Sequence, residues 1–318
     1  MSSLRRIAGW LLAASLAGYF AWFAWHALEP GALGALISPG VAAALVAAAL
    51  LYAAIIPITA WAWARLLARQ GESWQVVTLA RLLGRVQLAK YIPGNVAQHA
   101  GRAVLSLKAG MGGRPLAVTV VQETMLAVAA SVLVGVLALA LSAPGIAQLP
   151  PNSRGWLLGL GACLGLLVIV LSAFDRSPSS LLQSRSRLSR LLGRAGGLPG
   201  ARVVLPALAG YGLNYLLIGL GLWLVARAAG MPAALDLSLA IAAFALSWLL
   251  GFLAPGAPAG LGVREGIMVL LLAGAVPDAD ALAFVLLARL VTLTGDAIIY
   301  FASWLPTPGA GGKGLEMP

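Results

Sequence analysis

Long apolar runs separated by short polar segments dominate this chain. The runs cover residues 7–28, 41–64, 115–141, 156–174, 203–226 and 281–305. A helix of roughly 20 apolar residues crosses the hydrocarbon core of a bilayer, which is about 30 Å thick, so each run is long enough to span it. The pattern therefore predicts an all-α polytopic membrane protein with about six full spans.

Shorter apolar segments flank two breaks that contain proline and glycine. The first break lies at 90–95, between segments 74–89 and 95–109; the second lies at 254–266, between segments 237–253 and 267–276. In the first break, Pro93 removes a backbone donor and Gly94 adds backbone freedom. Because a bilayer offers no water to free backbone groups, such breaks persist only inside a helix bundle or beside a wet cavity. We therefore expect two re-entrant hairpins of broken helices.

Basic residues between the runs predict the orientation of the chain. The arginines between the fourth and fifth runs are Arg176, Arg185, Arg187, Arg190, Arg194 and Arg202. Such a cluster is typical of a cytoplasmic loop, and Arg5 and Arg6 place the N-terminus on the same side. Following the chain from there puts the C-terminus in the cytoplasm as well. The expected location is the cell (inner, cytoplasmic) membrane.

The order of the elements suggests an internal symmetry. Halves at about 1–142 and 153–305 each read as span, span, re-entrant hairpin and span, and the two halves run in opposite directions. Inverted repeats with broken helices that meet near the midplane are typical of alternating-access transporters. We expect a single transmembrane domain at 1–305, followed by a disordered tail at 306–318 that is rich in glycine and proline.

Composition agrees with the membrane assignment and excludes other classes. Hydrophobic residues make up 61% of the 318 residues and charged residues only 10%, whereas a soluble domain carries about 25% charged residues. One arginine-rich loop contributes a large part of the net charge of +11. It therefore favours a topology signal and contact with anionic lipid headgroups, and we expect no nucleic-acid partner. The single Cys163 excludes a disulfide within the chain.

Basic residues surround the first break. Arg81 and Arg85 are four residues apart and share a helix face, Lys90 opens the break, and Arg102 lies on the returning arm. The N-terminus of that arm would direct free N–H groups into the turn. Bases beside a helix N-terminus suit an anion, and phosphate is the obvious guest. Alternatively, Arg81 and Arg85 extend to the cytoplasmic headgroups.

Glu123 and His99 lie near this group of bases in the sequence. An unpaired carboxylate at Glu123, inside the third long run, would be costly, so we expect it to meet a base of the first hairpin. The pair is either structural or coupled to substrate or proton movement. His99 is either a proton carrier or a histidine satisfied within the returning arm.

A second charged group follows the second break. Arg264 and Glu265 open the outgoing arm, and Arg289 and Asp296 are seven residues apart on one face of the last run. We expect Arg289 and Asp296 to lower the burial cost of each other. The group forms either an internal structural network or a gate opposite the first hairpin. The substrate-binding residues predicted from both halves are Arg81, Arg85, Lys90, Pro93, Gly94, Asn95, Gln98, Arg102, Glu123, Arg264, Glu265, Arg289 and Asp296.

The two breaks also resemble a known family. Lys-Tyr-Ile-Pro-Gly-Asn-Val at 90–96, followed by Gly101 and Arg102, resembles the lysine–tyrosine–leucine–proline–glycine stretch of the lysylphosphatidylglycerol synthase transmembrane (flippase-like) family. Ala-Gly-Leu-Gly-Val-Arg-Glu-Gly at 259–266 resembles its second signature, and Ala-Arg-Leu-Val at 288–291 fits its final helix. Asn95 stands where a lysine is common in the family.

The resemblance implies a membrane domain that moves a lipid or a lipid-linked headgroup between leaflets. Bifunctional members of the family carry a soluble aminoacyl-transferase domain after the membrane part. This chain ends at Pro318 without one. We therefore expect a stand-alone member without lysyl transfer.

Three functions remain open at this point. The leading one is a flippase or transporter for an anionic phospholipid or a polyprenyl-phosphate-linked headgroup. It would need no cofactor and no metal, and without a Walker motif it would not hydrolyse ATP. A membrane lipid-phosphate hydrolase is the enzymatic alternative, but neither turn contains Ser, Thr or Cys as a nucleophile. An accessory subunit of a lipid-modifying enzyme or a glycosyltransferase is the third.

Overall fold

A computed structural model describes residues 38–91, 97–173, 199–254, 260 and 262–305. Within these ranges the chain folds into helices joined by turns. The expected first span at 7–28, most of the arginine-rich loop and the tail at 306–318 lie outside the described residues. So do Pro93, Gly94 and Asn95 of the first break.

Four helical segments of the described chain are long enough and apolar enough to cross a membrane. They are Pro39–Arg69, formed by α3 (Pro39–Ala53) and α4 (Ile55–Arg69), then α7 (Gly113–Leu141), α12 (Ala201–Ala228) and α15 (Asp278–Ala302). Each contains most or all of one expected run. The fourth expected run corresponds to α9 (Ser153–Ala173), a helix of 21 residues. The prediction of an all-helical membrane protein is therefore confirmed.

Local sequence signals explain where several helices begin. Ser38 precedes Pro39, and its hydroxyl accepts a hydrogen bond from the amide of Val41 at 3.3 Å. This combination of a capping serine and a proline in the first turn is a common helix start. In the same way, the carboxylate of Asp236 accepts from the amide of Leu239 at 2.6 Å and begins α13 (Leu237–Leu253).

Both expected breaks interrupt helices, but at slightly different positions from those predicted. Before the first break, α5 (Val76–Arg85) ends early and a 3-10 helix, η1 (Gln87–Tyr91), carries the chain to it; α6 (Ala97–Lys108) follows. After the second break, α14 (Val263–Leu272) begins before the expected residue 267. Gly262 has a φ of 81°, which ends the turn, and its amide donates to Glu265 at 2.7 Å. Glycine tolerates this conformation because it has no Cβ.

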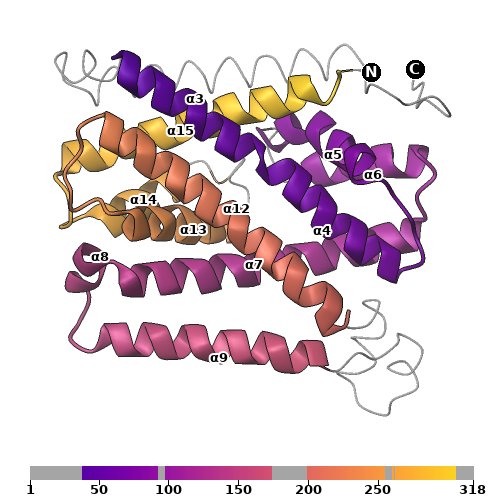
Figure 1. Ribbon diagram of the computed structural model, residues 1–318, viewed down its shortest axis with the longest axis horizontal. Helices are drawn as coiled ribbons and strands as arrows, with labels where there is room; N and C mark the ends of the chain where they lie inside the picture. Colours follow the sequence, from indigo (N-terminus) through magenta and orange to yellow (C-terminus); the bar gives the residue numbers. More distant parts are fainter. Residues whose placement is uncertain (1–37, 92–96, 174–198, 255–259, 261, 306–318) are drawn as a thin grey trace.

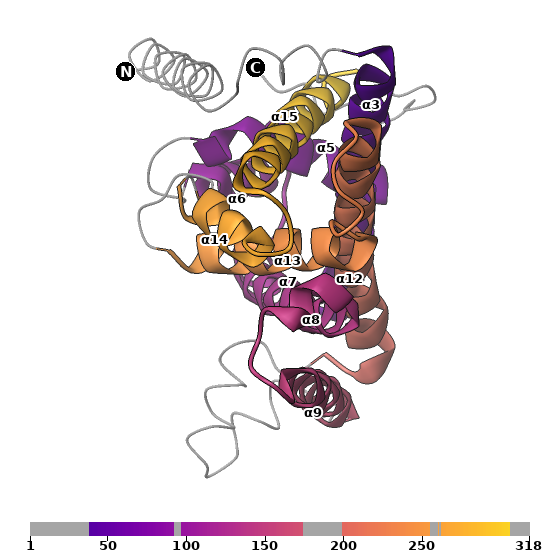
Figure 2. The ribbon, with the colours of Figure 1, turned by 90° about the vertical axis from the view of Figure 1, so that its left-hand side faces the viewer.

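The helices form a layered arrangement in which α9 and α15 occupy opposite ends. In Figures 1 and 2, α9 lies beyond α7, and α15 lies on the far side of the assembly near α3. A short helix, α8 (Ala143–Ala147), connects α7 toward α9. The broken segments α13–α14 and α5–α6 lie between these two ends.

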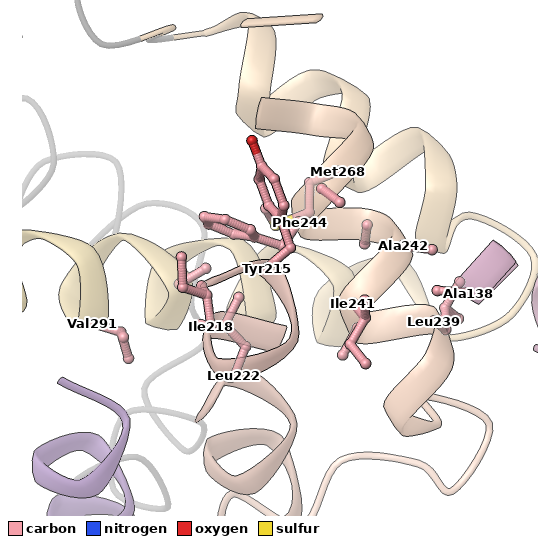
Figure 3. Close-up of a cluster of buried hydrophobic side chains, with 14 of the residues drawn as sticks. Ala138, Tyr215, Ile218, Leu222, Leu239, Ile241, Ala242, Phe244, Met268 and Val291 are labelled. Carbon is pink, nitrogen blue, oxygen red and sulfur yellow. The ribbon is translucent and has the colours of Figure 1, made fainter. Parts of the chain in front are cut away.

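The apolar core joins α13 to its neighbours. Figure 3 shows Phe244 and Ile241 of α13 beside Ile218 and Leu222 of α12, with Met268 of α14 nearby. A Cβ added at Gly219 of α12 would overlap the side chain of Ile241, so glycine permits the close approach of these helices. Small residues at helix crossings are typical of membrane proteins, because close packing replaces the hydrophobic drive there. This core fixes the position of the second break.

Candidate functional site

A cavity of about 280 Å³ lies where the described flanks of the two breaks meet. Its walls come from α3, α4, η1 and α6 on one side of the sequence, α7 in the middle, and α12, α13 and α14 on the other. Its charged and amide-bearing lining residues are Lys90, Gln98, Arg102, Glu123, Asn214 and Arg264. Lys90 and Arg102 of the first charged group therefore share one cavity with Arg264 of the second, as the meeting of two broken segments predicts.

Arg102 and Glu123 form a bidentate pair in the cavity wall. The guanidinium of Arg102 donates to both carboxylate oxygens of Glu123, at 3.1 and 2.5 Å. The face of Trp63 lies 3.7 Å from the guanidinium carbon, which adds a cation–π contact. The prediction that Glu123 meets a base of the first hairpin is confirmed. Its pairing offsets much of the positive charge that Arg102 would present to a ligand.

The carboxylate of Asp296 on α15 accepts hydrogen bonds from the polar side chains that precede the first break. It accepts from Lys90 at 2.7 Å, from Gln87 at 2.9 Å and from the hydroxyl of Tyr91 at 2.5 Å. Lys90 also donates to the hydroxyl of Tyr52 on α3 at 3.1 Å. Asp296 is fully buried, and these three donors satisfy its carboxylate.

Gln98 extends this network across the break. Its amide donates to Gln87 at 3.3 Å, and Gln87 donates in turn to Asp296. The start of α6 is thus connected to α15 through two side-chain amides. Such a chain of hydrogen bonds holds the two flanks of the first break together.

The direct ion pairs of Arg289 and Asp296 are formed with other segments rather than with each other. Arg289 instead forms an ion pair with Glu265 of α14, while Asp296 pairs with Lys90. Spacing along α15 placed the two residues on one face, but it did not reveal that each meets a different broken segment. Asp296 therefore joins the polar contacts of the first break, whereas Glu265 and Arg289 join those of the second.

Arg264 differs from the other cavity bases, because it has no hydrogen-bond or ion-pair partner among the residues that the structure describes. Its Nε is buried and unbonded, and its guanidinium carbon lies 5.1 Å from the centroid of the Phe244 ring. Its aliphatic stem passes two glycines: a Cβ at Gly260 would lie 2.6 Å from its Cδ, and a Cβ at Gly251 would overlap its Cγ. These glycines leave the space that directs Arg264 along the cavity wall.

Among the described residues, the predicted site residues that do not line the cavity are Arg81, Arg85, Glu265, Arg289 and Asp296. Nε of Arg81 donates to the carbonyl of Ser303 at 3.2 Å, and the guanidinium of Arg85 lies 4.6 Å from the Trp304 ring. Both arginines therefore contact the C-terminal end of α15, where helix carbonyls and the dipole favour a cation. We correct the expected phosphate site accordingly: neither residue lines the cavity.

Sequence reasoning missed a polar stripe on α12. Tyr211, Asn214 and Tyr215 all line the cavity, although the apolar run at 203–226 predicts only a span. The hydroxyl of Tyr211 and Oδ1 of Asn214 are buried without a hydrogen-bond partner among the described residues. The spacing i, i+3, i+4 puts all three on one helix face, and this signal was available in the sequence.

Aromatic rings and one imidazole complete the walls. Trp248 and Phe252 of α13 stack with ring centroids 5.3 Å apart and both line the cavity. Desolvation and the nearby Arg102 guanidinium lower the pKa of His99, which lies outside the four candidate spans. Within the described ranges, His, Cys, Asp and Glu form no cluster suited to a metal ion.

Comparison with known proteins identifies the family. A search among curated proteins finds no match. Residues 8–299, however, match the family described as the transmembrane region of lysylphosphatidylglycerol synthase. The match covers nearly the whole chain and includes both breaks and the residues around the cavity. The chain therefore belongs to this family of membrane proteins, whose name connects it to lipid.

Proposed function

We propose that this protein moves an anionic lipid between the leaflets of a membrane, with the headgroup held in the cavity. The observation that carries the proposal is the set of three bases, Lys90, Arg102 and Arg264, which line one cavity at the meeting of two broken segments. Broken helices at a repeat interface are the usual substrate site of secondary transporters. Membership of a lipid-related family supports the same reading.

The size of the cavity sets what enters it. Its volume of about 280 Å³ lies just below the range of roughly 300–1,000 Å³ found for small-molecule sites. A lipid headgroup fits this space, whereas two acyl chains or a prenyl chain do not. In the proposed mechanism the headgroup crosses through the cavity while the apolar tail stays in the bilayer.

The proposal includes an inverted repeat of about six spans and two re-entrant hairpins, with both termini in the cytoplasm. Movement then alternates access to the cavity from the two leaflets. The protein acts as a transporter and not as an enzyme, and its partners are membrane lipids. Anionic phospholipids and polyprenyl-phosphate-linked headgroups both fit this class.

Lipid translocation in proteoliposomes tests the function. Purified full-length protein is reconstituted with a trace of headgroup-accessible fluorescent anionic lipid, and dithionite then destroys the fluorescence in the outer leaflet. We expect the protein to increase the bleached fraction beyond the half that protein-free vesicles show. Equal bleaching in both preparations would contradict the proposal.

A cavity-filling variant shows whether translocation uses the cavity. Ala127 of α7 lines it, so Ala127→Phe should block translocation. Val121, on the same helix, is 48% exposed and lies outside the cavity lining, so Val121→Phe is the matched control. Unchanged translocation in a folded Ala127→Phe variant would exclude this cavity as the route.

A further inference from the structure

The charges around the cavity do not balance, and the imbalance is confined to one residue. Glu123 pairs with Arg102, and Asp296 pairs with Lys90. Glu265 pairs with Arg289 through one oxygen and accepts the Gly262 amide with the other. Arg264 is the remaining base, without an acidic partner in the described part of the chain.

The sequence adds no charge in the two short breaks of the chain that lie outside the described residues. Residues 92–96 and 255–259, together with 261, contain no ionisable side chain in the sequence. Burial and the nearby Arg102 lower the pKa of His99, which favours its neutral form. Among the described residues, the cavity therefore carries one uncompensated positive charge, at Arg264.

A single positive charge of this kind selects among lipid headgroups. A phosphodiester carries one negative charge and neutralises Arg264. A phosphomonoester carries nearly two charges at pH 7, because its second pKa is about 6, and leaves one negative charge without a partner. A zwitterionic headgroup brings a cation as well, and the nearby carboxylates that would receive it are already engaged.

Two unbonded polar groups add a requirement for hydroxyls. The hydroxyl of Tyr211 and Oδ1 of Asn214 line the same cavity without partners among the described residues. A buried polar group without a hydrogen bond is costly, so a ligand that forms hydrogen bonds with both groups gains affinity. An amide oxygen accepts but does not donate, and phosphate oxygens cannot satisfy it. A hydroxyl donates and accepts, so it suits both groups.

We infer that the cavity is selective for a monoanionic phosphodiester lipid whose headgroup carries free hydroxyls, a glycerol, polyol or sugar, with Arg264 as the phosphate ligand. The inference rests on the proposed function and names its substrate class. It also excludes the cationic lipid in the family's name, because lysylphosphatidylglycerol carries a net positive charge and would face Arg264.

Binding to wild-type protein tests the inference without any variant. Short-chain phosphatidylglycerol, phosphatidylmethanol, phosphatidic acid, phosphatidylcholine and lysylphosphatidylglycerol are titrated onto the full chain in neutral detergent at pH 7.5 or so, with thermophoresis as the readout. We expect phosphatidylglycerol to bind best and phosphatidylmethanol, which lacks headgroup hydroxyls, to follow about threefold to tenfold weaker. The other three should bind at least about tenfold more weakly than phosphatidylglycerol. Equal binding of phosphatidylcholine or lysylphosphatidylglycerol would overturn the inference.

Three variants separate the contributions. Arg264→Gln should abolish the preference for phosphatidylglycerol over phosphatidylcholine, and Arg264→Lys should retain most of it. Arg85→Gln is the matched control, since Arg85 also stacks on an aromatic ring but lies outside the cavity. Tyr211→Phe should weaken the binding of phosphatidylglycerol and leave the binding of phosphatidylmethanol unchanged. An unaltered preference in a folded Arg264→Gln protein would refute the assignment.

The outcomes of this experiment are distinct from failure of the proposed function. Selective binding without translocation in proteoliposomes would reject transport and keep the headgroup class. Translocation of zwitterionic and anionic lipids at equal rates, with equal binding, would keep transport and reject the selectivity.

Discussion

Nζ of Lys90 lies 2.7 Å from Oδ1 of Asp296, and this contact ties the first break to α15. The same helix carries Arg289, which pairs with Glu265 of α14 just after the second break. One helix thus holds both broken segments through charged pairs. In a transporter that alternates between two states, movement of either broken segment relative to α15 has to rearrange one of these pairs.

The Lys90–Asp296 pair should be strongly coupled. Asp296→Asn leaves the charge of Lys90 without its carboxylate, and loss of one partner of a buried pair costs about 3–5 kcal/mol. The double variant Lys90→Met/Asp296→Asn removes both charges, so it should be more stable than Asp296→Asn alone. Thermal unfolding in detergent of the wild type, Lys90→Met, Asp296→Asn and the double variant measures this coupling. Additive effects of the two substitutions would show that the pair contributes nothing.

The glycines beside Arg264 should be needed for its position. Alanine in a helix is normally more stable than glycine by roughly 0.5–1 kcal/mol, but a Cβ at Gly251 would overlap the stem of Arg264. We expect Gly251→Ala to reduce binding of phosphatidylglycerol about tenfold while the protein stays folded. The control is Gly266→Ala, because no atom lies within 4 Å of the added Cβ. If both variants bind like wild type, Arg264 does not depend on this space.

Much of the helical fold follows from the sequence because its cause is local. Length and hydropathy define α7, α12 and α15, and few side-chain details are needed to place them. The sequence also predicts that Glu123 pairs with a basic residue, since a carboxylate inside an apolar run requires a base. In both cases a general energetic requirement admits few solutions.

The remaining features depend on tertiary neighbours that no spacing rule identifies. Arg289 and Asp296 share a helix face, yet each pairs with a different segment. The contact of Arg81 with the end of α15 joins residues more than 200 positions apart. Arg264 has no acidic partner in the described ranges, and this can be seen only once the packed arrangement shows which base each neighbouring acid contacts.

The inverted repeat remains a prediction that labelling can test. On a background in which Cys163 is replaced by serine, cysteines at Ser189 and Lys313 should react with a membrane-impermeant maleimide only from the cytoplasmic side. A cysteine at Asp278, which begins α15 and is exposed, should react from the outside. The basic cluster between the fourth and fifth runs is the reason for this orientation. Labelling of Ser189 and Asp278 positions from the same side would contradict opposed halves.

The last prediction concerns the charge of the cavity. Glu123→Gln removes the carboxylate that compensates Arg102, so the cavity gains a second uncompensated positive charge. A dianionic phosphomonoester should then become the better ligand. At about pH 8, where phosphatidic acid carries nearly two charges, we expect its affinity relative to phosphatidylglycerol to rise about tenfold in Glu123→Gln over wild type.

Acidification reverses this gain, and the direction follows from the ligand. The second pKa of a phosphomonoester is about 6, so below it the headgroup carries a single charge and resembles a phosphodiester. The advantage of phosphatidic acid in Glu123→Gln should therefore be present above about pH 7 and disappear near pH 5. Titration of both lipids at these pH values by thermophoresis measures it, and Thr124→Val, a neighbouring cavity position without charge, is the control. An affinity ratio in Glu123→Gln that equals the wild-type ratio at every pH would show that the pairing of Arg102 and Glu123 does not set the charge seen by the ligand.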